Sequence, residues 1–110
     1  MSVAIMSSHA DTAVARELWA SFISLIRSYT AAHGLNGTRQ AVLEVSEHHL
    51  LVRAGDRLLT VRFDGERGSW QRESDAATAF TLDEHGRVIV KGETEEMDMV
   101  AERLAREIMR

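Results

Sequence analysis

The chain contains no cysteine and no proline, and its only aromatic residues are two Trp, one Tyr and three Phe. The absence of cysteine excludes disulfides, thiol nucleophiles and cysteine-based zinc sites. The absence of proline excludes a proline-rich linker or recognition segment. Lysine is nearly absent as well, with one Lys against twelve Arg, and the arginines form no cluster in the sequence. These absences remove several protein classes and identify none.

Acidic residues outnumber basic ones, 17 to 13, which gives a formal net charge of −4. Nucleic-acid binders use an excess of cations to neutralise phosphates, so neither nucleic acid nor an anionic membrane surface is an expected partner. The longest apolar stretch without charges, residues 18–26, is interrupted by serines and is too short to span a bilayer. The first residues lack the positive start of a signal peptide. We therefore expect a soluble, cytoplasmic protein.

A length of 110 residues with 45% apolar and 27% charged residues is typical of one globular domain. A chain of this length can bury one modest core. The sequence contains no internal repeat and no second composition regime. We expect residues 1–110 to form a single α+β domain, with residues 1–8 as a loose N-terminal tail.

Two segments have the periodicity of amphipathic helices. The first extends from about Asp11 to His33, and we expect Gly34 to end it in the left-handed conformation. The second extends from about Glu95 to Met109, with Thr94 as its N-cap. The apolar face of the first helix comprises Val14, Leu18, Phe22, Leu25 and Tyr29.

Between the helices the hydrophobic period is two, which is typical of strands. None of the seven glycines lies inside a periodic segment, so each is expected in a turn or a cap. Short turns favour a meander, a single antiparallel sheet of five to six strands with both helices packed on one face. The expected strands are residues 40–46, 50–54, 57–63, 69–73, 78–82 and 87–90.

The turn lengths also set a register for this sheet. The register places Val52 opposite Leu59 and Val61 opposite Trp70 on the face under the helices. It also places Arg72 on that inner face, where a charged side chain conflicts with the pattern. We expect one of two features to resolve this conflict: a β-bulge near Gly68, or a position of this strand at the edge of the sheet.

The outer face of the sheet is the candidate functional surface. Val42, Leu51 and Leu58 fall there among polar neighbours, on strands about 4.8 Å apart, so their side chains can form one patch. Scattered aliphatic residues are also common on ordinary surfaces. The functional interpretation is a non-catalytic module that binds another protein, or homodimerises, through this open face. The candidate contact residues are Val42, His49, Leu51, Arg53, Leu58 and Arg62.

Two other functions stay open. Trp19 and Trp70 would line a crevice between helices and sheet in which a small molecule binds, or would simply be core residues. An enzyme would use His49 with Arg53 or Arg62, inside a dry cleft. No linear catalytic motif is present, however, so a non-catalytic protein is favoured.

The sequence gives no reason to expect a metal or a cofactor. Adjacent residues on a strand point to opposite faces, so His48 and His49 cannot easily share one ion, and we expect His48 in the turn. The acidic residues from Glu93 to Asp98 lack calcium-loop spacing and are explained by the dipole of the helix that follows.

The order of elements, a helix, five to six strands and a second helix, resembles that of frataxin-like domains and, more loosely, of type III secretion chaperones. The resemblance covers most of the chain and concerns topology, not a motif. Frataxins have an acidic first helix that binds iron. Here that helix offers only Asp11 and Glu17, so the resemblance implies no iron site.

Overall fold

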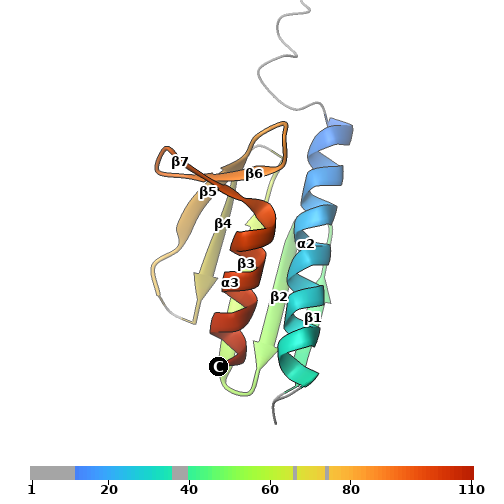
Figure 1. The fold of residues 1–110 in the computed structure, drawn as a ribbon, viewed down its shortest axis with the longest axis vertical. Coiled ribbons are helices and arrows are strands. Elements are labelled where there is room, and N and C mark those ends of the chain that lie inside the picture. The colour runs from blue at the N-terminus through green and yellow to red at the C-terminus, as the bar shows by residue number, and fades with distance from the viewer. Residues whose placement is uncertain (1–11, 36–39, 66, 74) are drawn as a thin grey trace, which may run out of the picture.

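The computed structural model describes residues 12–35, 40–65, 67–73 and 75–110, which form two helices and a seven-stranded antiparallel sheet (Figure 1). The strands are arranged as a meander, because their order in the sheet is their order in the chain. The expected tail at residues 1–8 and helix start at Asp11 lie outside the described residues. The elements are α2 (Thr12–Leu35), β1 (Ala41–Val45), β2 (His49–Ala54), β3 (Arg57–Phe63), β4 (Arg67–Arg72), β5 (Thr78–Leu82), β6 (Arg87–Val90), β7 (Glu93–Glu96) and α3 (Met97–Met109).

Both helices lie side by side on one face of the sheet (Figure 1). This confirms the predicted α+β class and the predicted layer arrangement. The core lies between the two layers. It is formed by alternate residues of the strands and by the apolar faces of the helices. Its strand residues are Leu50, Val52, Ala54, Leu59, Val61, Phe63, Trp70, Phe80 and Val88.

The register agrees with the one predicted from the turn lengths. Val52 pairs with Leu59, and Val61 pairs with Trp70. All four side chains are buried under the helices. The direction in which the side chains of β1 to β4 point is therefore settled by the alternation of the sequence.

The predicted conflict at Arg72 is real, but both expected explanations for it are wrong. Arg72 does pair with Leu59 on the inner face. The pairing of β3 with β4 is continuous, so there is no bulge, and β4 has a strand on each side. Arg72 instead lies beyond the last β4–β5 pair, where its guanidinium donates to the Glu107 carboxylate of α3 at 2.7 Å. An ion pair at the margin of the core therefore accommodates the charge.

Gly68 departs from the expectation that every glycine lies in a turn or a cap. It lies inside β4, paired with Phe63 on one side and Phe80 on the other. A Cβ atom at this position would lie 2.2 Å from Cζ of Phe80 and 2.7 Å from the backbone oxygen of Arg62. Gly68 is therefore needed for close packing, because the ring of Phe80 occupies the space that a side chain would take.

Two helix boundaries also differ from the prediction. Gly34 lies within α2 and has no positive φ, so it does not end the helix in the left-handed conformation. At the other helix, residues 93–96 form a seventh strand, because Lys91 and Gly92 adopt φ angles of 52° and 81° and close a two-residue hairpin. Consequently α3 begins at Met97, not Glu95, and Thr94 is not its cap.

Neither α2 nor α3 combines the length and the apolar character that crossing a membrane requires.

Candidate functional site

The open face of the sheet, on the side away from the helices, holds all six candidate contact residues. The register places Arg53 between Val42 and Leu58 in one row. In the next row Leu51 lies between Glu44 and Thr60. His49 and Arg62 are direct partners in a third row. The arrangement is the one expected from the sequence, because side chains on each strand alternate between the two faces.

The aliphatic residues of this face are diagonal neighbours, not direct partners. Val42 is 62% exposed, whereas Leu51 and Leu58 are partly buried. Leu51 is diagonal to both, and the Arg53 stem lies in the row between Val42 and Leu58. The methylene groups of an arginine can cover apolar surface while its charged end stays in water. The patch therefore combines aliphatic side chains with the guanidinium of Arg53, and the Glu44 carboxylate lies in the next row beside Leu51.

Three arginines of this face differ from the other arginines of the sheet and of α3. Within the part of the chain that the structure describes, the side chains of Arg53, Arg62 and Arg67 have no hydrogen bond or ion pair. By contrast, an acidic partner lies within 4.0 Å of each of Arg57, Arg72, Arg87, Arg103 and Arg106. A free guanidinium presents a planar set of donors that fits a carboxylate.

His49 lies at the edge of a hollow of about 400 Å³ that Arg62, Arg67 and Ser69 also line. Its Nδ1 atom lies 2.7 Å from the hydroxyl oxygen of Ser46. The same oxygen accepts a hydrogen bond from the His49 backbone N–H at 3.2 Å, so this pair closes the turn between β1 and β2. Ser46, His49 and Arg62 are all exposed to solvent. The dry cleft that the enzyme hypothesis requires is not formed around them.

The two tryptophans do not face one another across an open crevice. Trp19 stacks on Phe63 with ring centroids 5.5 Å apart, and Trp70 stacks on Phe80 at 5.1 Å. The two phenylalanines stack on each other at 6.2 Å and fill the space between. A hollow of about 500 Å³ does lie beside Trp70, between the sheet and Arg103, but Trp19 is not among its lining residues.

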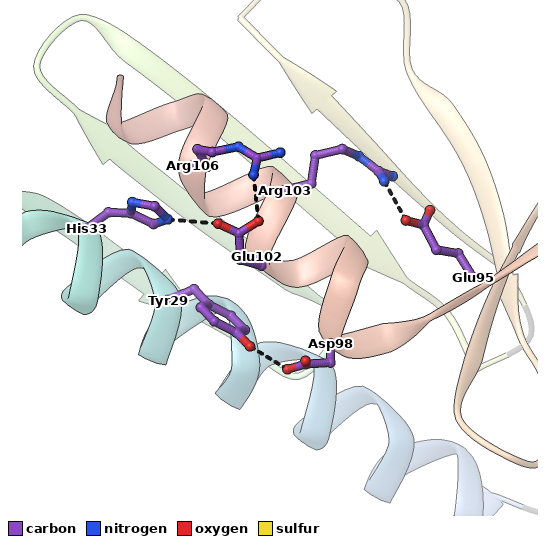
Figure 2. A network of polar contacts seen from close by, with 7 residues as sticks. All are labelled: Tyr29, His33, Glu95, Asp98, Glu102, Arg103 and Arg106. Carbon is purple, nitrogen blue, oxygen red and sulfur yellow. Dashed lines mark hydrogen bonds and ion pairs between the residues drawn. The ribbon is translucent and has the colours of Figure 1, made fainter.

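A polar network between the helices was not expected from the sequence (Figure 2). Tyr29 of α2 donates a hydrogen bond to Asp98 of α3 at 2.6 Å, and this bond raises the pKa of the phenol. One turn further along, His33 lies 3.1 Å from the Glu102 carboxylate, which also accepts a hydrogen bond from Arg106. Tyr29 and His33 are four residues apart on α2, and Asp98 and Glu102 are four residues apart on α3. In the sequence, this spacing was the feature that could have indicated the network. The network joins the helices at their solvent-exposed side.

Asp83 organises the turn between β5 and β6. Burial raises the pKa of its carboxyl group, but hydrogen bonds from the backbone N–H groups of Arg87 and His85 and from the Arg87 side chain outweigh burial and lower it. Gly86 completes the turn by donating to the Asp83 carbonyl at 3.0 Å. These hydrogen bonds within the turn explain the aspartate without a ligand.

Among the described residues, no three His, Asp or Glu side chains come together in a group that could hold a metal ion. Comparison with known proteins finds no match, whether among protein-family models, curated proteins or solved structures.

Proposed function

We propose that the chain is a non-catalytic protein-interaction module, and that the open face of β1 to β4 is its contact surface. The observation that carries the proposal is the pair Arg53 and Arg62, whose side chains have no partner among the described residues, beside the partly buried Leu51 and Leu58. A module of this kind works in the cytoplasm, the compartment that the sequence favours.

The chemistry of the face indicates the kind of partner. A protein surface with carboxylates around an apolar side chain fits it, because the carboxylates pair with the guanidinium groups while Leu51 and Leu58 lose contact with water. A second copy of the chain also meets this description, since Glu44 lies on the same face as Arg53. Burial of the aliphatic side chains would supply affinity, and the charges would fix orientation.

The proposal is tested by two variants of the face, Leu51→Glu and Arg53→Glu, beside the control Met99→Glu. Met99 is 59% exposed on α3, away from the face, so its substitution introduces elsewhere the same negative charge that Leu51→Glu introduces on the face. We expect a specific protein from the source cells to be retained by the wild type and by Met99→Glu, and lost by both face variants. Retention of the same proteins by all four chains would contradict the proposal.

Light scattering on the same four proteins identifies the occupant. If the occupant is a second copy, the wild type and Met99→Glu have twice the mass of both face variants at the same concentration. In both experiments, circular dichroism must show that the variants are folded.

A further inference from the structure

The two edges of the sheet differ in chemistry. β7 carries Glu93, Glu95 and Glu96, and closely spaced charges discourage a further strand from pairing there. β1 has the sequence AVLEV, with a single charge. Two of the three exposed large hydrophobic residues in the described part of the chain, Val42 at 62% and Val45 at 50% exposure, lie on β1. An apolar edge strand of this kind favours pairing with another strand.

The backbone of β1 offers a row of free hydrogen-bonding groups. The Ser46 N–H donates to the His49 carbonyl at 2.8 Å, so these two residues form a hydrogen-bonded pair. Such pairs alternate along antiparallel strands, so Val42 and Glu44 also direct their backbone groups to β2. Ala41, Leu43 and Val45 direct theirs away from the sheet, on a side where no described strand lies.

We propose that β1 pairs with β1 of a second copy, antiparallel, about a two-fold axis at Leu43. In this register Leu43 faces Leu43 of the second copy, and Ala41 faces Val45. Each of the three outward-directed residues then both donates and accepts a backbone hydrogen bond. The two sheets become one, with the helices of both copies on the same side. The backbone pairing itself requires no occupant on the open face.

Charge supports this register over its neighbours. Glu44 would lie opposite Val42 of the second copy, so the two Glu44 carboxylates do not face each other. Arg53 of the second copy lies on the next strand beyond that valine, and its guanidinium has no partner among the residues that the structure describes. The long side chain of Arg53 in the second copy can extend across Val42 of that copy. Its guanidinium then lies close to the Glu44 carboxylate of the first copy. A register centred on Glu44 would instead place the two carboxylates opposite one another.

A hollow beside β1 provides room for the second copy. A space of about 700 Å³ lies between α2 and β1, and its lining includes Ser28, Ala31, Ala41 and Leu43. Ala41 is the residue that faces Val45 of the second copy in the proposed register, on the inner side of the sheet. The half-exposed Val45 therefore enters this hollow and is removed from water, which stabilises the pair of strands.

The sharpest test is amide hydrogen exchange of β1 as a function of protein concentration. At low concentration we expect the amides of Val42 and Glu44 to be protected by β2, while those of Leu43 and Val45 exchange freely. At high concentration the Leu43 and Val45 amides become protected as well. Free exchange of both at a concentration where light scattering shows a dimer would overturn the proposal, and so would a chain that stays at 12.3 kDa at all concentrations.

Variants separate the edge from the open face. Val45→Pro removes an N–H group that the single chain does not use, and prolines are tolerated on edge strands. We expect it to weaken the dimer by roughly tenfold or more and to leave the circular dichroism spectrum unchanged. Leu51→Glu, on the open face, should leave the edge dimer intact. The reverse pattern, in which Leu51→Glu dissociates the dimer and Val45→Pro does not, would refute edge pairing while supporting a dimer through the face.

Val45→Lys provides the second variant in case the proline disturbs folding. This variant retains the N–H group and the fold, but it places two lysine charges, one from each copy, between the paired β1 strands. We expect a folded monomer. A folded Val45→Lys protein that dimerises as strongly as the wild type would count against pairing through β1.

Discussion

Replacing Gly68 by alanine tests the packing of the core most directly. The new methyl group would lie 2.2 and 2.5 Å from two ring carbons of Phe80, and 2.7 Å from the Arg62 backbone oxygen. The ring cannot simply move aside, because Phe80 is 2% exposed and stacks on Trp70 and Phe63. Both the ring and the backbone of the neighbouring strand must shift to accommodate the methyl group.

The expected cost follows from two opposing effects. Overpacking a well-filled core costs about 1–3 kcal/mol. Replacing a glycine inside a strand by alanine returns roughly 0.5–1 kcal/mol, because the unfolded chain loses freedom. We therefore expect Gly68→Ala to lower the free energy of unfolding by about 1–2 kcal/mol, which corresponds to a Tm about 4–8 °C lower for a domain of this length.

Urea denaturation followed by tryptophan fluorescence measures this change. The control is Ser69→Ala, one residue along the same strand, whose side chain points to the open face and whose loss should cost no more than about 0.5 kcal/mol. A double variant with Phe80→Leu should lose less stability than the sum of the single variants, with a coupling above about 0.5 kcal/mol. If Gly68→Ala equals or exceeds the wild type in stability, the packing described for Phe80 is wrong.

The remaining predictions concern the direction of the side chains and two titrating groups. Leu51→Glu should keep the native circular dichroism spectrum, whereas Val52→Glu, which buries an unpaired charge, should abolish it. Tyr29 is the only tyrosine, so ultraviolet titration should show its phenol ionising above pH 10, and Asp98→Asn should shift this back towards the ordinary value. The pKa of Asp83 is lower in the folded chain than its ordinary value of 3.8. Ionised Asp83 therefore stabilises the fold at pH values above 3.8, and this contribution is lost as the pH falls through the pKa of the folded state. The stability difference between wild type and Asp83→Asn, from urea denaturation, should therefore be larger at pH 7 than at pH 3.

The sequence was sufficient to predict which face each strand residue occupies, because one shift in register would turn every core side chain to the solvent. Leu50 and Leu59 are fully buried, and their neighbours Leu51 and Leu58 lie on the other face, as expected. The seventh strand was missed because its glutamates are also the residues expected at a helix N-terminus. The positive φ angles of Lys91 and Gly92, in a turn without the usual asparagine, make the hairpin.

The candidate surface was predicted less completely than the fold. Strand alternation places Arg53 and Arg62 on the open face, but it does not show whether a carboxylate lies within reach. That depends on how strands and helices meet in space, as the Arg72–Glu107 pair illustrates. The close approach of Gly68 to Phe80 has the same origin, since strand sequence does not specify the rotamer of a ring on the neighbouring strand.

The ion pairs distinguish arginines that stabilise the fold from arginines that are available to a binding partner. Arg72 reaches a glutamate of α3, so its removal perturbs the packing of that helix on the sheet. Arg53 and Arg62 have no such partner in the described chain, and an exposed charge without a partner contributes little to stability. Arg62→Glu should consequently change the free energy of unfolding by less than about 0.5 kcal/mol while reversing the charge of the open face. A large loss of stability in a urea titration would instead assign this arginine to the fold and remove it from the contact surface.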